Sequence, residues 1–321
     1  MQRYHDCPQV LREFLIYHEN IKGQSPLTIS EYYLDLRMFL RFIKLMRNDM
    51  PMSTNLDDID IKEIDIQFIR DIDTSDIFDF LSYLANDRAI NPDSAAPEYG
   101  ISPAARARKL SSIKSFYKYL TTRTKQLQEN PVADLEYPKL RKSLPKYLTM
   151  EQSAALLKSV SGQNEKRDYA ILMLFLNCGI RRSELVNLNL SDVYEDRIRV
   201  IGKGNKERVV YFNARTKLHL QQYLNERTDS NPALFVSLNS PHSRLTISGV
   251  EVRIRKMGQA LSMPKVHPHK FRRTLATMAI DKGMPIEQVQ RLLGHVRIDT
   301  TLHYAIVNQN NVKLAHKKYL G

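Results

Sequence analysis

The stretch VHPHKFRRTLATMAIDKGMPIEQVQRLLGHVRIDTTLHYA, residues 266–305, gives the strongest indication of fold and chemistry in the chain. His269 and Arg272 lie three residues apart near its start. On a helix, residues with this spacing share one face, so their side chains converge on a single point. The pair therefore predicts a two-pronged clamp for an anion.

The second half of this stretch predicts a helix end followed by a tyrosine. The run Leu-Leu-Gly-His is typical of a helix that ends near Leu293, with Gly294 as a left-handed cap and His295 just beyond it. Tyr304 follows nine residues after His295. Together with the clamp, this order predicts one pocket that is faced by two histidines, an arginine and a tyrosine.

The composition favours a polyanionic partner. The 321 residues carry a formal net charge of +13, and the pI is about 9.6. Each Lys or Arg that meets a phosphate releases condensed counterions, so this charge favours nucleic acid. Charge alone does not separate DNA from RNA or an acidic membrane, and a solvated basic surface is a simpler alternative. Our hypothesis is that the pocket holds a DNA phosphodiester, which Tyr304 attacks.

Several other classes of protein are not indicated. No apolar run approaches the roughly 20 residues that cross a bilayer, and the polar residues 1–8 do not resemble a signal peptide. We therefore expect a cytoplasmic protein with no membrane partner. Cys7 and Cys178 are too few and too far apart for a disulfide framework or a CxxC metal site. We expect neither a metal nor another cofactor.

Helical periodicity and a proline-containing segment divide the chain into two domains. The first contains amphipathic segments with caps expected at Ser25, Ser75 and Ser102, and the segments are residues 9–20, 28–46, 76–86 and 103–122. A basic segment with three prolines and little periodicity is typical of a linker. We expect a DNA-binding domain, a linker and a catalytic domain at residues 1–123, 124–147 and 148–321.

Cations on the polar faces of two helices of the first domain are candidates for contacts with the DNA backbone. An ordinary solvated face explains the same pattern. The candidates are Arg37, Arg41, Lys44, Arg106, Arg108, Lys109 and Lys114. In contrast, residues 56–79 contain nine acidic residues. We interpret this segment as a solvated loop or a subunit-facing surface, because metal ligands must converge and not merely be abundant.

The second domain is predicted to be helical with one β-hairpin. Thr149 and Gln152 have the spacing of a capping box, and residues 167–177 are apolar nearly all round, as in a core helix. Arg181 follows this helix at a turn, where the alternative is a surface arginine paired with Glu184. Residues 197–212 alternate in the manner of two strands around a Gly-rich tip that carries Lys203. The spacing of a P-loop is absent, so ATP use is not indicated.

These elements, in this order, resemble the tyrosine recombinase (phage integrase) family, and most closely its compact bacterial Xer-type members. The resemblance extends over nearly the whole chain. In the first domain it rests on the motifs at residues 25–28, 32–40, 115–117 and 130–132. In the second it rests on GIRRSEL (179–185), GKGNKER (202–208), HKFR (269–272), LGH (293–295) and TTLHY (300–304).

The resemblance implies a mainly α fold, with a helical SAM-like core-binding domain followed by an α-rich catalytic domain that contains a small antiparallel β-sheet. It implies strand cleavage through a 3′-phosphotyrosine, followed by attack of a partner strand's 5′-hydroxyl. The catalytic set would be Arg181, Lys203, His269, Arg272, His295 and the nucleophile Tyr304. Arg182 and Arg273 stand beside the two implied arginines, so both of those assignments depend on register.

The implied partner is double-stranded DNA with paired recombination sites, bound by a homo- or hetero-tetramer in which a terminal helix near residues 308–318 docks on the next protomer. An accessory DNA translocase is a further expected partner. The implied task is chromosome dimer resolution or the movement of a mobile element, and the lack of an extra N-terminal domain favours the former. Two alternatives are a non-catalytic helical DNA-binding regulator and a type IB topoisomerase-like enzyme that relaxes DNA.

Overall fold

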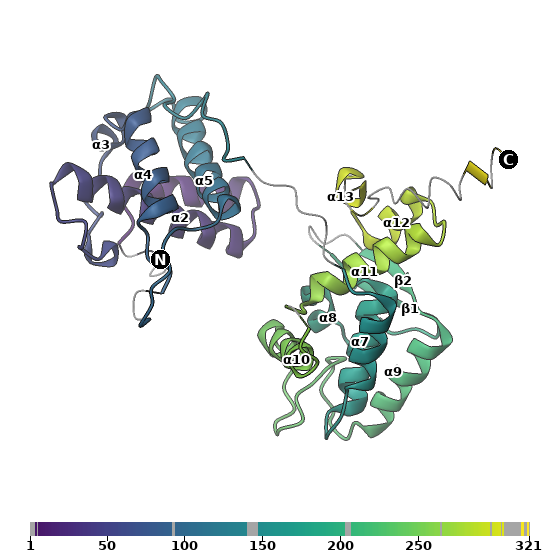
Figure 1. Ribbon diagram of the computed structural model, residues 1–321. Coiled ribbons are helices and arrows are strands. Elements are labelled where there is room, and N and C mark those ends of the chain that lie inside the picture. The colour runs from purple at the N-terminus through teal and green to yellow at the C-terminus, as the bar shows by residue number, and fades with distance from the viewer. Residues whose placement is uncertain are drawn as a thin grey trace. The chain divides into compact units, whose positions relative to one another are not determined.

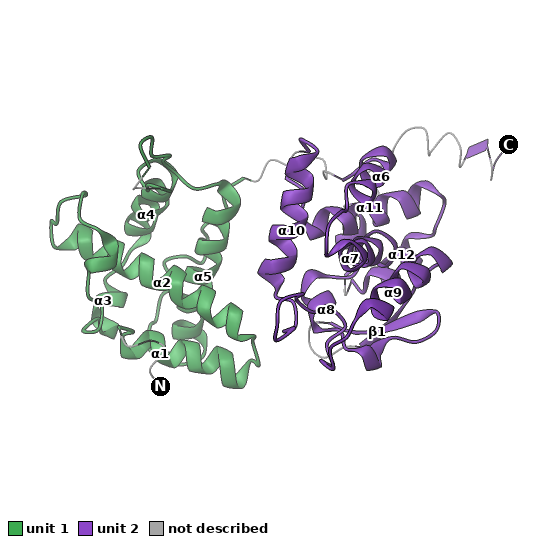
Figure 2. Ribbon diagram, turned by 90° about the horizontal axis from the view of Figure 1, so that it is seen from below, with its two compact units in different colours: residues 1–142 green, residues 143–321 purple. Residues whose placement is uncertain are grey.

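The chain folds into two compact units, residues 1–142 and 143–321 (Figure 2). The computed structural model describes residues 4, 6–91, 94–139, 147–202, 207–263, 265–295, 297–302, 304, 316, 317 and 320. Each unit has its own hydrophobic core. The division falls inside the basic segment that the sequence predicts as a linker.

Helices build the first unit (Figure 1). They are α1 (Gln9–Ile16), which continues as a π-helical turn (Tyr17–Ile21), α2 (Pro26–Arg47), a 3₁₀ turn (Leu56–Asp58), α3 (Ile66–Arg70), α4 (Thr74–Asn86) and α5 (Pro103–Thr122). The longest, α2, packs against α1, α4 and α5. Phe14, Phe39 and Phe80 are fully buried between these helices, and each contributes roughly 1.5–3 kcal/mol by its burial.

The helix caps of the first unit confirm two predictions and correct a third. Ser25 and Ser102 cap α2 and α5, each followed by proline at the first helical position. The prediction that Ser75 caps α4 is wrong, because Asp73 is the N-cap. Its carboxylate accepts the N–H of Asp76, whose own carboxylate accepts the N–H of Asp73. This reciprocal pair satisfies two free N–H groups, so it starts the helix earlier than the serine would.

The second unit is helical and contains a two-stranded antiparallel sheet, which confirms the predicted fold class. Its elements are α6 (Met150–Lys158), α7 (Glu165–Cys178), α8 (Arg182–Asn187), a 3₁₀ turn (Leu190–Asp192), β1 (Arg197–Ile201), β2 (Glu207–Tyr211), α9 (Ala214–Glu226), α10 (Ile247–Ala260), α11 (Pro268–Asp281), α12 (Ile286–Leu293) and α13 (Asp299–Leu302).

Helix α7 is the core helix of this unit, as its apolar sequence predicts, and it packs against both α9 and α11 (Figure 1). The capping box of Thr149 and Gln152 starts α6, and the predicted hairpin is formed by β1 and β2. Residues 203–206, which include Lys203, lie outside the described residues. The helix expected at 308–318 also lies outside them, apart from His316 and Lys317.

Candidate active site

A glycine brings the end of α7 against α11 and α12. Gly179 has a positive φ of 56°, and a Cβ added there would lie 2.7 Å from a δ carbon of Leu275 and 2.9 Å from one of Leu293. Only glycine combines this conformation with so close an approach. The turn delivers Arg181, the N-cap of α8, to the same place.

Arg272 ties these segments together from α11. Its guanidinium donates to the carbonyl oxygens of Gly179 and Leu293, at the ends of α7 and α12. The side chain is buried, with 3% of the residue exposed. Burial, together with the nearby charges of Arg181 and Arg208, lowers the pKa of Arg272 to about 9. It stays cationic at neutral pH, so a desolvated positive charge lies where these segments meet.

One buried carboxylate joins two more arginines. Glu184 accepts hydrogen bonds from the backbone N–H and Nη1 of Arg181, at 2.7 and 2.6 Å. It also accepts from Nη1 and Nη2 of Arg208, at 2.8 and 2.7 Å. Burial alone would raise the pKa of Glu184, but the hydrogen bonds from Arg208 and Arg181 outweigh burial and lower it to about 2. Glu184 is therefore ionised at neutral pH.

His295 and Tyr304 complete the cluster. Gly294, with φ of 63°, ends α12 as predicted, and Arg181 Nη2 donates to its carbonyl at 3.2 Å. Nδ1 of His295 lies 2.9 Å from the hydroxyl oxygen of Thr301, and the His295 and Tyr304 ring centroids are 5.9 Å apart. Burial and the surrounding arginines lower the pKa of His295 to about 4, so this imidazole is neutral at pH 7.

His269 lies in the first turn of α11 with an exposed side chain. Burial of part of the ring and the charges of Arg182 and Arg272 lower the pKa of His269. Arg182 itself pairs with Glu251 of α10. The structure thus brings Arg181 rather than Arg182 to the carbonyl of Gly294.

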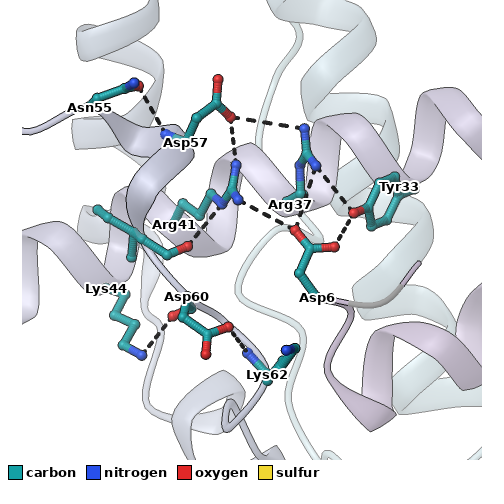
Figure 3. Close-up of polar contacts among 10 residues, drawn as sticks. Asp6, Tyr33, Arg37, Arg41, Lys44, Asn55, Asp57, Asp60 and Lys62 are labelled. Carbon is teal, nitrogen blue, oxygen red and sulfur yellow. Dashed lines mark hydrogen bonds and ion pairs between the residues drawn. The ribbon is translucent and has the colours of Figure 1, made fainter. Parts of the chain in front are cut away.

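The candidate DNA contacts of the first unit divide by burial, and Figure 3 shows one group of them. Arg41 is buried and pairs with Asp57 at 2.6 Å and with Asp6 at 3.4 Å. Arg37 pairs with Asp6 at 3.5 Å and with Asp57 at 3.9 Å, and it keeps about a quarter of its side chain exposed. Lys44 donates to the backbone carbonyl of Asp60.

Helix α5 repeats this division. Lys109 is buried and donates to Asp35, whose fully buried carboxylate also accepts from Arg108 and from the hydroxyl of Ser112. Arg108 has 47% of its side chain exposed, and it also pairs with Glu31. Lys114 lies over the ring of Tyr137 and donates to a backbone carbonyl, and Arg106 is half-buried.

Burial and internal pairing leave Arg41 and Lys109 little means of reaching a phosphate. Both hold the first unit together: Arg41 links α2 to the segment after it, and Lys109 links α5 to α2. The prediction of DNA contacts therefore rests on the other five cations, Arg37, Lys44, Arg106, Arg108 and Lys114.

Arg181 and Arg272 therefore meet at the end of α12, next to His295 and the ring of Tyr304. The model of the phage integrase family matches residues 146–311, about half of the chain. The tyrosine recombinase XerC of Caldanaerobacter subterraneus subsp. tengcongensis is 39% identical over 318 residues, which cover 97% of this chain and 86% of that protein. The chain belongs to the phage integrase family of tyrosine recombinases.

The fold of this recombinase is also that of solved relatives. The site-specific recombinase XerH bound to its difH substrate has a TM-score of 0.65 at 21% identity, covering 97% of this chain and 84% of that chain. A lambda integrase dimer bound to a COC′ core site has a TM-score of 0.63 at 16% identity, covering 91% and 94%.

Family membership establishes an enzyme that cleaves and rejoins DNA strands in site-specific recombination. The comparisons do not favour a non-catalytic regulator or a topoisomerase-like enzyme.

Among the described residues, no helix is long and apolar enough to cross a membrane. The part of the chain that the structure describes also holds no group of three His, Cys, Asp or Glu side chains arranged for a metal ion.

Two members of the cluster of this recombinase, Glu184 and Arg208, are absent from the set predicted from the sequence. The sequence indicates Glu184 only as the partner of a surface arginine. The pairing with Arg181 exists, but the carboxylate is buried. Their positions in the sequence are the features that could have identified them. Glu184 lies three residues after Arg181 in the first turn of α8, and Arg208 follows the tip of the hairpin.

Proposed function

We propose that Tyr304 is the nucleophile of this recombinase and that Arg181, Arg272 and His295 bind the phosphate that it attacks. The observation that carries the proposal is their convergence at the end of α12. The two guanidiniums donate to the adjacent carbonyls of Gly294 and Leu293, and the next residue, His295, faces the ring of Tyr304.

Each group has the chemical state that this role needs. Arg181 and Arg272 are cationic donors for non-bridging phosphate oxygens, and they stabilise the charge that grows in the pentacovalent state. His295 is neutral at pH 7 and pairs through Nδ1 with the Thr301 hydroxyl. That pairing is compatible with a proton on Nε2, which would donate to a phosphate oxygen.

In the proposed cleavage step, Oη of Tyr304 forms a bond to phosphorus while the bond from phosphorus to the 5′ oxygen breaks. His269, whose lowered pKa favours the neutral imidazole, assists removal of the phenol proton. Lys203 gives a proton to the departing 5′ oxygen; this assignment rests on the sequence motif, since Lys203 lies outside the described residues. A partner strand's 5′-hydroxyl then attacks the phosphotyrosine and releases Tyr304, so the step conserves bond energy without ATP.

Tyr304→Phe tests the nucleophile. With a nicked substrate that traps the intermediate, this variant should form no covalent adduct and should bind the site with nearly unchanged affinity. Tyr211→Phe, at an exposed tyrosine of β2, is the matched control and should form a normal adduct. A normal yield of adduct from Tyr304→Phe would remove Tyr304 from the mechanism.

The general acid is tested separately with Lys203→Ala. This variant should cleave an ordinary site slowly but a site with a 5′-thiol leaving group at nearly the wild-type rate, because a thiolate leaves without protonation. Lack of rescue by the thiol substrate would assign the acid elsewhere.

We further propose that the recombinase acts in the cytoplasm on paired sites in double-stranded DNA, within a homo- or hetero-tetramer. The similarity to XerC proteins favours chromosome dimer resolution, with an accessory DNA translocase, over movement of a mobile element. The first unit would contact the core of each site through its exposed cations, and the terminal segment would dock on a neighbouring protomer. Deletion of the residues after Ala305 should therefore weaken synapsis more than single-site binding; equal losses would refute the docking role.

A further inference from the structure

We propose that Arg208 is a positioning residue of the active site, which neutralises Glu184 and thereby keeps the charge of Arg181 available to the scissile phosphate. The inference rests on the proposed function, because it concerns the same phosphate. Arg208 is not a member of the catalytic set implied by the sequence, so the proposal adds a residue to the active site.

The geometry of the hairpin aims Arg208 into the unit. Arg208 on β2 lies opposite Val200 on β1, and opposite residues of an antiparallel pair share one face of the sheet. Val200 is fully buried, so this is the inner face. The Arg208 side chain is accordingly only 13% exposed. Arg199 lies on the other face, where it pairs with Asp192.

The contact between Arg208 and Glu184 is a parallel fork. Both Nη atoms donate, at 2.8 and 2.7 Å, one to each carboxylate oxygen. Such bidentate pairs are among the strongest hydrogen-bonded contacts in proteins, and they fix orientation as well as charge. The Glu184 side chain is 2% exposed, so water does not compete for its oxygens.

Glu184 is shared between Arg208 and Arg181. Arg181 binds it with the backbone N–H and with Nη1, while Nη2 binds the carbonyl of Gly294. The carboxylate thus orients Arg181, but alone it would also cancel the positive charge of Arg181. Arg208 removes that conflict, since it supplies the opposite charge that Glu184 requires.

The formal charges of these residues show what the loss of Arg208 would change. Arg181, Arg208 and Arg272 set three positive charges against the one negative charge of Glu184, which leaves two for the phosphate. Without Arg208 only one positive charge remains, next to a buried carboxylate that is now half-satisfied. If Glu184 is made neutral as well, two positive charges are restored. A purely structural role of Arg208 predicts no such recovery.

The experiment compares Arg208→Met, Glu184→Gln and the double variant in single-turnover cleavage of a nicked site. Arg208→Met should cleave about 100-fold more slowly than the wild type, the size of loss that a misplaced catalytic group typically causes. The double variant should recover at least about 10-fold of this loss. Arg199→Met is the matched control on the opposite face of the same hairpin, and it should cleave normally.

The design separates this proposal from folding defects and from the proposed function. Arg208→Lys keeps the charge and loses the fork, so it should fold and cleave at a rate between those of the wild type and Arg208→Met. A double variant that is folded, binds DNA and cleaves no faster than Arg208→Met would overturn the proposal. If even the wild type forms no adduct, the proposed function fails, and acid unfolding of Arg208→Met still decides. In the wild type, Glu184 contributes stability that is lost as pH falls below its ordinary pKa toward about 2. Arg208→Met raises the pKa of Glu184 in the folded state, so this acid-induced loss of stability should be smaller than in the wild type, and an unchanged loss would overturn the proposal.

Discussion

Replacement of Gly294 by alanine perturbs the active site through a single methyl group. The backbone there has φ of 63°, in which an L-residue pays about 1–2 kcal/mol. The new Cβ would also lie 2.9 Å from Cδ and 3.2 Å from Nε of Arg208. Carbon atoms prefer about 3.5–4.0 Å, so the Arg208 side chain must shift by about 0.6 Å or more. That shift strains a fork whose bonds to a charged partner are worth roughly 1.5–3 kcal/mol each.

We therefore expect Gly294→Ala to lower the free energy of unfolding by about 2–4 kcal/mol and to slow cleavage by about 10-fold or more. Gly283→Ala is the control: Gly283 follows α11 with φ of 89°, and its added Cβ would meet nothing within 4 Å. It should lose only the backbone contribution and cleave normally. Urea unfolding and single-turnover cleavage of both variants measure the difference. Equal losses of stability, with equal cleavage rates, would refute the coupling of Gly294 to Arg208.

Three other predictions concern titration, a buried charge and salt. Folding holds the pKa of His295 at about 4, below its ordinary 6.5, so the unfolded state binds more protons than the folded state between these pH values. The free energy of unfolding should therefore fall by up to about 3 kcal/mol as pH decreases from 6.5 to 4. In urea titrations at several pH values, His295→Asn should flatten this dependence on pH. Asp35→Asn leaves the buried Lys109 without its carboxylate and should destabilise the first unit by about 3–5 kcal/mol in thermal unfolding; a loss below about 1 kcal/mol would contradict the described network. Arg108→Ala and Lys114→Ala should each reduce the slope of log affinity against log salt by about 0.9 in filter binding, and an unchanged slope would remove that residue from the DNA interface.

The features that local chemistry fixes were predictable from the sequence. The end of α12 follows from Gly294, since a helix that meets glycine in this context ends in the left-handed conformation. The hairpin follows from period-two alternation on both sides of a glycine-rich tip. His269 and Arg272 lie on one helix, α11, which is the condition on which the predicted clamp depends. The family resemblance rests on the same local motifs.

Pairing between distant residues was not predictable in the same way. From the sequence, Arg41 and Lys109 appear on the polar faces of their helices. In the structure both are buried, and both pair with carboxylates from other parts of the chain. Arg41 meets Asp6, 35 residues away, and Lys109 meets Asp35, 74 residues away. Helical periodicity carries no information on such partners, because they come from other elements. The same limit hid the contact of Arg208 with Glu184.

The net charge of +13 is distributed unequally between the two units. Residues 1–142 contain 20 Lys and Arg against 21 Asp and Glu, whereas residues 143–321 contain 28 against 14. The excess positive charge therefore belongs wholly to the second unit. In the first unit, carboxylates such as Asp57 and Asp76 bind Arg41 and Arg47, so the acidic segment 56–79 serves partly as an internal counter-charge. Counterion release should accordingly arise mainly from the second unit, and its exposed cations should dominate the salt dependence of DNA binding.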